Sequence, residues 1–175
     1  MNSPWSFPVR LAEIDRGPQT LDLAPDHHTR ARIAKVVGVD AINSLDAKVT
    51  LKPWLDGAEL AGRITANVTQ TCGITLDPFQ SPIETTFTVR VLPAGSKNAP
   101  GPETHELVVD PDAEDPPEVL EGDVVDVGTY VLEYLALEVD PFPRKPGAVF
   151  ESPEPPVVIS PFAALAALKG EDEPH

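Results

Sequence analysis

Residues 44–72 read SLDAKVTLKPWLDGAELAGRITANVTQTC, and this stretch decides the fold. Apolar residues alternate with polar ones on both sides of its centre, which is typical of strands that bury one face. The Asp56-Gly57 pair at the centre is a hairpin signal. A third alternating run, SPIETTFTVRVLP at 81–93, follows an Asp77-Pro78 turn. The three runs predict an antiparallel meander, in which Gly62 marks a bulge.

Two further strands are predicted upstream of the meander. Large apolar residues alternate through residues 5–14, and Pro4 and Pro8 within or beside this run favour a place at a sheet edge. A turn around Gly17 precedes a short strand at 19–24. Together with the meander, these runs predict a sheet of five to six strands.

Residues 25–37 change to a helical period. Asp26 or Thr29 can cap this helix, and Gly38 is a natural end. The predicted apolar face consists of Ile33, Ala34, Val36 and Val37. The opposite face is the densest basic group in the chain, and it consists of Arg30, Arg32 and Lys35. A solvated helix face explains these charges, and a contact to RNA phosphates is the alternative.

The second half of the chain begins with a loop at about 94–117, followed by a helix at 126–138. Ten acidic residues lie between Glu103 and Asp126 without a lysine or arginine, which predicts a mobile acidic loop that includes at most a short strand at 107–109. Asp126 is the expected N-cap, and Leu132 and Leu137 widen the apolar stripe of the helix. The helix is expected to end at Asp140-Pro141.

The predicted fold class is α+β. An antiparallel sheet of five to six strands, able to curl toward a barrel, is covered by two helices and a short C-terminal helix. Residues 1–150 are expected to form one domain that contains the acidic loop. Residues 151–175 are expected to form a proline-rich linker, a helix at 160–169 capped by Ser160, and an acidic tail.

The composition excludes several classes of protein. No apolar run approaches the ~20 residues of a membrane-spanning helix, and the N-terminus lacks the pattern of a secretory signal. The net charge is −15, and 21 of the 175 residues are proline. Such a surface repels nucleic-acid phosphates and favours basic partners, although solubility alone is an equally good explanation.

Chemistry-bearing motifs are missing. Cys72 is the single cysteine, and the four histidines at 27, 28, 105 and 175 do not lie in segments that suggest a rigid catalytic support. The chain has no glycine-rich phosphate loop and no zinc-binding spacing. Cys72 continues the alternation of Leu60, Ile64 and Val68, which predicts a core position. We therefore expect no catalytic residue, no metal and no cofactor.

Three stretches resemble the YceD family of large ribosomal RNA subunit accumulation proteins. VTQTCGITLDPF at 68–79 is similar to a Cys-x-x-Cys-Leu-Glu-Pro-Phe segment of the family, EGDVVDVGTYVLEYLALEVDPFP at 121–143 to its acidic helix start, and SPFAALAALK at 160–169 to its ending. The matching motif positions are Cys72, Asp77, Pro78, Phe79, Asp123, Asp126, Gly128 and Pro141. Thr69 stands where many members have the first cysteine, so metal binding is not carried over to this chain.

The resemblance implies a cytoplasmic, non-enzymatic factor in the accumulation of large-subunit ribosomal RNA, without a membrane partner. Because of the acidic charge, we expect it to bind a basic ribosomal protein or a pre-ribosomal particle, through the 103–126 segment and the 126–138 helix. The first alternative is direct RNA binding by Arg30, Arg32 and Lys35. The second is a redox or enzymatic protein centred on Cys72.

Overall fold

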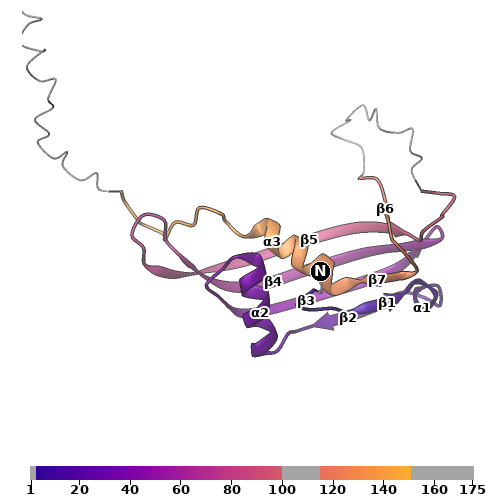
Figure 1. The fold of residues 1–175 in the computed structure, drawn as a ribbon, viewed down its shortest axis with the longest axis horizontal. Helices are drawn as coiled ribbons and strands as arrows, with labels where there is room; N and C mark the ends of the chain where they lie inside the picture. The colour runs from indigo at the N-terminus through magenta and orange to yellow at the C-terminus, as the bar shows by residue number, and fades with distance from the viewer. Residues whose placement is uncertain (1–2, 100–114, 151–175) are drawn as a thin grey trace, which may run out of the picture.

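The computed structural model describes residues 3–99 and 115–150, and its fold is α+β, as predicted (Figure 1). A five-stranded sheet has the order β2-β3-β4-β5-β6, and a second sheet pairs β1 with β7. The elements are β1 Pro8–Arg10, α1 Leu11–Ile14, β2 Gln19–Leu23, α2 His27–Val37, β3 Ala41–Trp54, β4 Gly57–Thr71, β5 Pro78–Leu92, β6 Glu118–Val119, β7 Val124–Asp126 and α3 Val127–Glu138.

The predicted meander is confirmed in β3, β4 and β5, which pair antiparallel over almost their whole lengths. The bulge is not at Gly62, where the prediction placed it. Gly62 pairs regularly with Val49 and Phe87, and the register shift lies between Ile42 and Ser44 instead. Packing explains why a glycine stands at position 62, because a Cβ there would overlap the Phe87 ring.

The prediction of a purely antiparallel sheet is wrong in one pair, because β6 runs parallel to β5. The sheet also does not curl into a closed barrel. Its outer strands, β2 and β6, have five and two residues and do not pair with each other. Helices α2 and α3 instead cover one face of the open sheet, and their buried side chains belong to the same apolar cluster as those of the strands.

The N-terminal segment differs from the predicted 5–14 strand. Only Pro8–Arg10 is extended, and it pairs with β7 rather than with the large sheet. Leu11–Ile14 is a helical turn that buries Leu11 and Ile14, whose spacing of three brings them to one helix face. Phe7 is exposed, so the alternation of large residues in this run does not mark one buried strand face.

Both long helices begin where their caps predict. Asp26 accepts a hydrogen bond from the Thr29 amide at 2.7 Å, and Gly38 ends α2 with a φ of 78°. Asp126 caps α3 by accepting from the Gly128 amide at 3.1 Å. Two predicted core residues are exposed, however: Val36 by 65% and Leu137 by 78%. Each lies off the stripe that its helix turns toward the sheet.

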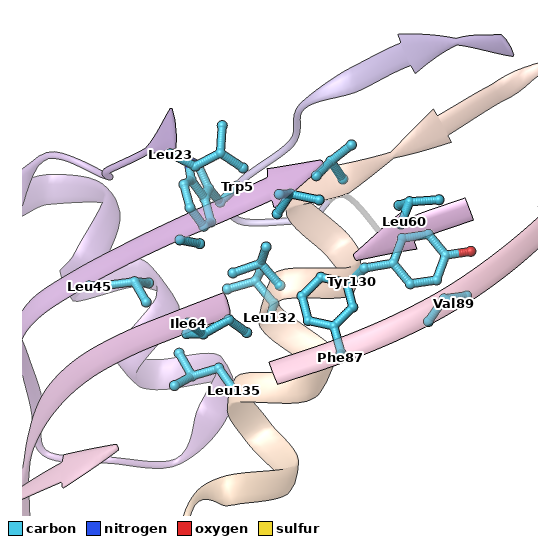
Figure 2. Close-up of a cluster of buried hydrophobic side chains, with 14 of the residues drawn as sticks. Trp5, Leu23, Leu45, Leu60, Ile64, Phe87, Val89, Tyr130, Leu132 and Leu135 are labelled. Atoms are coloured by element: carbon cyan, nitrogen blue, oxygen red, sulfur yellow. The ribbon is translucent and has the colours of Figure 1, made fainter. Parts of the chain in front are cut away.

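The core lies between α3 and the inner face of β3, β4 and β5. Figure 2 shows Tyr130, Leu132 and Leu135 of α3 facing side chains of the sheet such as Leu60, Ile64 and Phe87. The Phe87 and Tyr134 rings stack with centroids 4.6 Å apart and planes 13° apart. This stack packs α3 against β5. The predicted strand at 107–109 and the predicted helix at 160–169 lie outside the described residues.

Candidate functional site

The loop from Cys72 to Asp77 is a closed turn between β4 and β5. The Cys72 amide donates to the Asp77 carbonyl at 2.9 Å, and the Leu76 amide donates back to the Cys72 carbonyl at 2.9 Å. Leu76 has a φ of 60°, which is rare for a leucine. The Gly73 amide donates to the Pro143 carbonyl at 2.9 Å, so the turn is bound to the chain that follows α3.

The Cys72 thiol is buried and accepts hydrogen bonds from backbone amides. Its Sγ accepts from the amides of Thr75 at 3.5 Å, Lys145 at 3.3 Å and Ile74 at 3.4 Å. These bonds, those from Thr75 above all, lower the pKa of Cys72 from 9.0 to about 6. The predicted burial is confirmed, but the residue lies outside the main apolar cluster.

Among the described residues, the hydrogen-bond contacts of this thiol are with backbone amides, and none is with a histidine. His27 and His28 are the first two residues of α2. In the parts of the chain that the structure describes, no group of three or more His, Cys, Asp or Glu residues is arranged to hold a metal ion. Asp77 forms an ion pair with Lys145 at 3.2 Å, which lowers the pKa of the Asp77 carboxyl. The geometry indicates that the turn serves to hold two segments together.

Asp126 and Gly128 bind the N-terminal segment to the start of α3. The Asp126 carboxylate accepts from the Phe7 amide at 2.7 Å and from the Ser6 hydroxyl at 2.6 Å. The Val127 amide donates to the Phe7 carbonyl at 3.0 Å. A Cβ on Gly128 would come within 2.6 Å of the Trp5 carbonyl oxygen, so only glycine allows this approach. We call these contacts the N-terminal clamp.

The other motif positions also make structural contacts. The Asp123 carbonyl accepts from the Leu11 amide at 2.9 Å. Pro78 and Phe79 begin β5 and pair with the end of β4. Pro141 follows Asp140, whose carbonyl accepts from the side chain of Gln70 at 2.9 Å. These residues join the ends of strands and helices.

An acidic hollow opens between the end of β5, the chain before β6, and α3. It has a volume of about 560 Å³ and is lined by Thr88, Val89, Arg90, Asp115, Pro116, Glu118 and Tyr134. The Tyr130 hydroxyl donates to Glu118 at 2.8 Å. Burial raises the pKa of the nearby Glu133 carboxyl, and the Glu118 carboxylate raises it further. Three carboxylates, those of Asp115, Glu118 and Glu133, therefore gather on one side of the molecule.

A comparison with protein families matches residues 60–169 to the model described as Large ribosomal RNA subunit accumulation protein YceD. The chain belongs to the YceD family. The match spans more than half of the sequence and includes the Cys72 turn, Asp126 and Gly128. No curated protein and no solved structure matches the chain. The family description connects YceD proteins with the accumulation of large-subunit ribosomal RNA.

Thr69 of this YceD chain lies on the other side of the sheet from the buried Cys72. Its hydroxyl accepts from the Asn43 side chain at 3.0 Å on the exposed face. The two side chains do not converge. Within residues 3–99 and 115–150, no helix has the length and the apolar content needed to span a membrane.

The basic residues of α2 do not form one patch in this YceD protein. Arg30 donates to the Pro25 carbonyl at 2.9 Å, and its Nε atom is buried without a hydrogen-bond partner among the described residues. Arg32 donates to the Pro4 carbonyl at 2.6 Å. Lys35 is exposed. The spacing of the three residues along the helix explains this, since Arg30 falls on the edge of the buried stripe rather than beside Arg32.

The acidic hollow was only half predictable. The run of carboxylates before Asp126 indicated its charge, but the contribution of Glu133 and Tyr134 requires α3 to lie along β5. The alternation of apolar and polar residues along β5 does not indicate which strand, if any, lies beside its second edge, opposite β4. The edge of β5 is therefore a feature that the sequence did not indicate.

Proposed function

We propose that this YceD protein is a non-enzymatic accessory factor that acts in the cytoplasm. In this role it supports the accumulation of large-subunit ribosomal RNA by binding a basic ribosomal protein, alone or within an assembly intermediate. The observation that carries the proposal is the acidic hollow on a chain of net charge −15. Carboxylates grouped in this way attract lysine and arginine and repel phosphates.

The raised pKa of Glu133 supports the choice of a basic partner. Burial and the nearby Glu118 carboxylate both make the negative charge on Glu133 costly in the free protein. A cationic side chain placed between these carboxylates removes the repulsion. The partner surface we propose consists of the 103–126 segment and α3, of which residues 115–126 and α3 are described.

Direct RNA binding through Arg30, Arg32 and Lys35 has weaker support. Two of the three side chains donate to backbone carbonyls of the protein itself. RNA binding that falls steeply with salt and is lost on charge reversal of the three would favour this alternative.

The test compares two double variants with equal loss of negative charge. Asp115→Asn with Glu133→Gln removes two negative charges from the partner surface, whereas Asp15→Asn with Asp46→Asn removes two negative charges from exposed carboxylates elsewhere. Tagged proteins are used to recover large-subunit precursor particles, which are separated by sedimentation. We expect the first pair, and a variant lacking residues 103–114, to recover much less ribosomal protein than the second pair. Equal recovery by all variants would contradict the proposal.

A further inference from the structure

Within residues 3–99 and 115–150, strand β5 has one long edge with which no strand pairs over most of its length. On one side it pairs with β4 from Pro78 to Val91. On the other side β6 pairs only with Val91 and Leu92. Among the described residues, no strand pairs with the edge from Pro78 to Arg90. Such an edge presents unpaired amides and carbonyls to another chain.

One hydrogen bond shows which residues of β5 face this edge. The Leu120 amide donates to the Leu92 carbonyl at 2.8 Å, so Leu92 directs its backbone groups toward the β6 side. Successive residues of a strand point their backbone groups to opposite sides, and the register with β4 is continuous. Glu84, Thr86 and Thr88 therefore present their amides and carbonyls at the edge.

Prolines and β6 limit the usable part of this edge. Pro82 is an even-numbered residue like Glu84, Thr86 and Thr88, so its backbone nitrogen also points away from β4. This agrees with the assignment, because proline has no amide hydrogen to donate to β4. Pro78 and Pro82 remove two of the three outward amides in the first part of the edge and leave that of Gln80, and β6 covers the last residues of the edge. The stretch from Glu84 to Thr88 is the length of a short added strand.

The carboxylates near this stretch lie mainly on its inner side, the side of α3. On the inner side, Tyr134 stacks on Phe87, and Glu138 accepts from the Thr85 hydroxyl at 3.0 Å. The acidic hollow begins at Thr88. On the outer side, Glu84 lies 3.3 Å from Arg63 in an exposed ion pair. Side chains of an added strand that point toward α3 would thus meet carboxylates, whereas those on the other side would meet the Glu84–Arg63 ion pair.

We propose that the β5 edge at Glu84–Thr88 binds an extended, lysine- or arginine-rich segment of a partner protein as an additional β-strand. Backbone hydrogen bonds supply the pairing, and the carboxylates of α3 and of the hollow select basic side chains. The inference rests on the proposed function in that the partner is basic, and it adds the site and the mode of binding.

The first test uses the full-length protein and a fluorescent eight-residue peptide of alternating lysine and threonine. Thr86→Pro removes one outward amide and places a proline ring in the path of the added strand. Pro82, four residues earlier, already has this effect at its own position. Thr86→Val keeps the amide and removes only the hydroxyl. We expect Thr86→Pro to weaken binding about ten-fold or more and Thr86→Val to leave it nearly unchanged.

A second peptide, of alternating glutamate and threonine, tests the charge. We expect it not to bind the wild-type protein. If Thr86→Pro binds the lysine peptide as tightly as the wild type, or if the glutamate peptide binds equally well, the edge proposal is wrong while the proposed function stands. If neither the lysine peptide nor basic ribosomal proteins bind the wild-type protein, both are wrong.

Hydrogen exchange on the wild-type protein decides the matter even if Thr86→Pro does not fold. In the free chain, the amides of Glu84, Thr86 and Thr88 should exchange quickly, and those of Thr85 and Phe87 slowly. The lysine peptide should slow the first three. Slow exchange of these three in the free chain would show that the edge is already occupied and would overturn the proposal, and light scattering would show whether a second copy is responsible.

Discussion

Replacing Gly128 by alanine tests the N-terminal clamp. The added Cβ would lie 2.6 Å from the Trp5 carbonyl oxygen and 3.2 Å from the Phe7 amide nitrogen. These are backbone atoms, and three hydrogen bonds from Ser6, Phe7 and Val127 hold them in place. The segment cannot move aside without losing those bonds.

The magnitude follows from two opposing effects. Alanine is favoured over glycine in a helix by about 1 kcal/mol. Forcing a methyl group into a filled space costs about 1–3 kcal/mol, and the upper part of this range applies because backbone atoms obstruct it. We therefore expect Gly128→Ala to lower the free energy of unfolding by about 2 kcal/mol. For a chain of this size, that corresponds to a drop in Tm of about 4–8 °C.

Urea unfolding followed by tryptophan fluorescence measures this change. Gly122→Ala is the matched control, because a Cβ there meets no atom within 4 Å. The control should change the unfolding free energy by no more than about 0.5 kcal/mol. If Gly128→Ala is as stable as the wild type, the close approach of Trp5 is not the reason for a glycine at this position.

Two more predictions concern the sheet and the turn. Gly62→Ala should lower the unfolding free energy by about 1–3 kcal/mol because its Cβ would overlap the Phe87 ring, and adding Phe87→Leu should cost less than the two single changes together; additive costs would contradict this. The thiolate absorbance of Cys72 should titrate near pH 6 in the folded protein, against 9.0 as the ordinary value. Because the folded pKa is the lower one, the stability that the thiolate contributes is complete above pH 9 and is lost as the pH falls through about 6. The stability advantage over Cys72→Ser should therefore grow from pH 6 to pH 9, and a thiol that titrates near 9 in the folded state would refute the account.

Much of the fold was predictable because it depends on local patterns. Alternation over 14 or 15 residues identified β3, β4 and β5, and the caps at Asp26 and Asp126 located α2 and α3. The short strands β6 and β7 were not predictable, since two or three residues carry no period. Their existence depends on the strand beside which they lie.

In the candidate sites, too, local features were predictable from the sequence and contacts between distant segments were not. The burial of Cys72 was predictable by continuing the alternation of β4 one residue past its end, but the Lys145 amide that contacts its sulfur lies 73 residues away in the sequence. The sequence placed Arg30 on the basic face of α2, but it did not indicate that the Pro25 carbonyl would accept a hydrogen bond from this side chain. The open edge of β5 depends on how little of that strand β6 covers, which is a property of tertiary structure.

The motif positions lie outside the Glu84–Thr88 stretch of β5, yet several of them fix α3, whose side chains line that stretch. The N-terminal clamp holds the start of α3, and the Cys72 turn holds the chain that follows it through Gly73 and Lys145. Between these two attachments, Tyr134 and Glu138 lie against β5. A helix held at both ends keeps its carboxylates at a constant distance from the strand edge. A change in the clamp should therefore affect binding through stability, whereas a change at Thr86 should affect binding while leaving α3 in place.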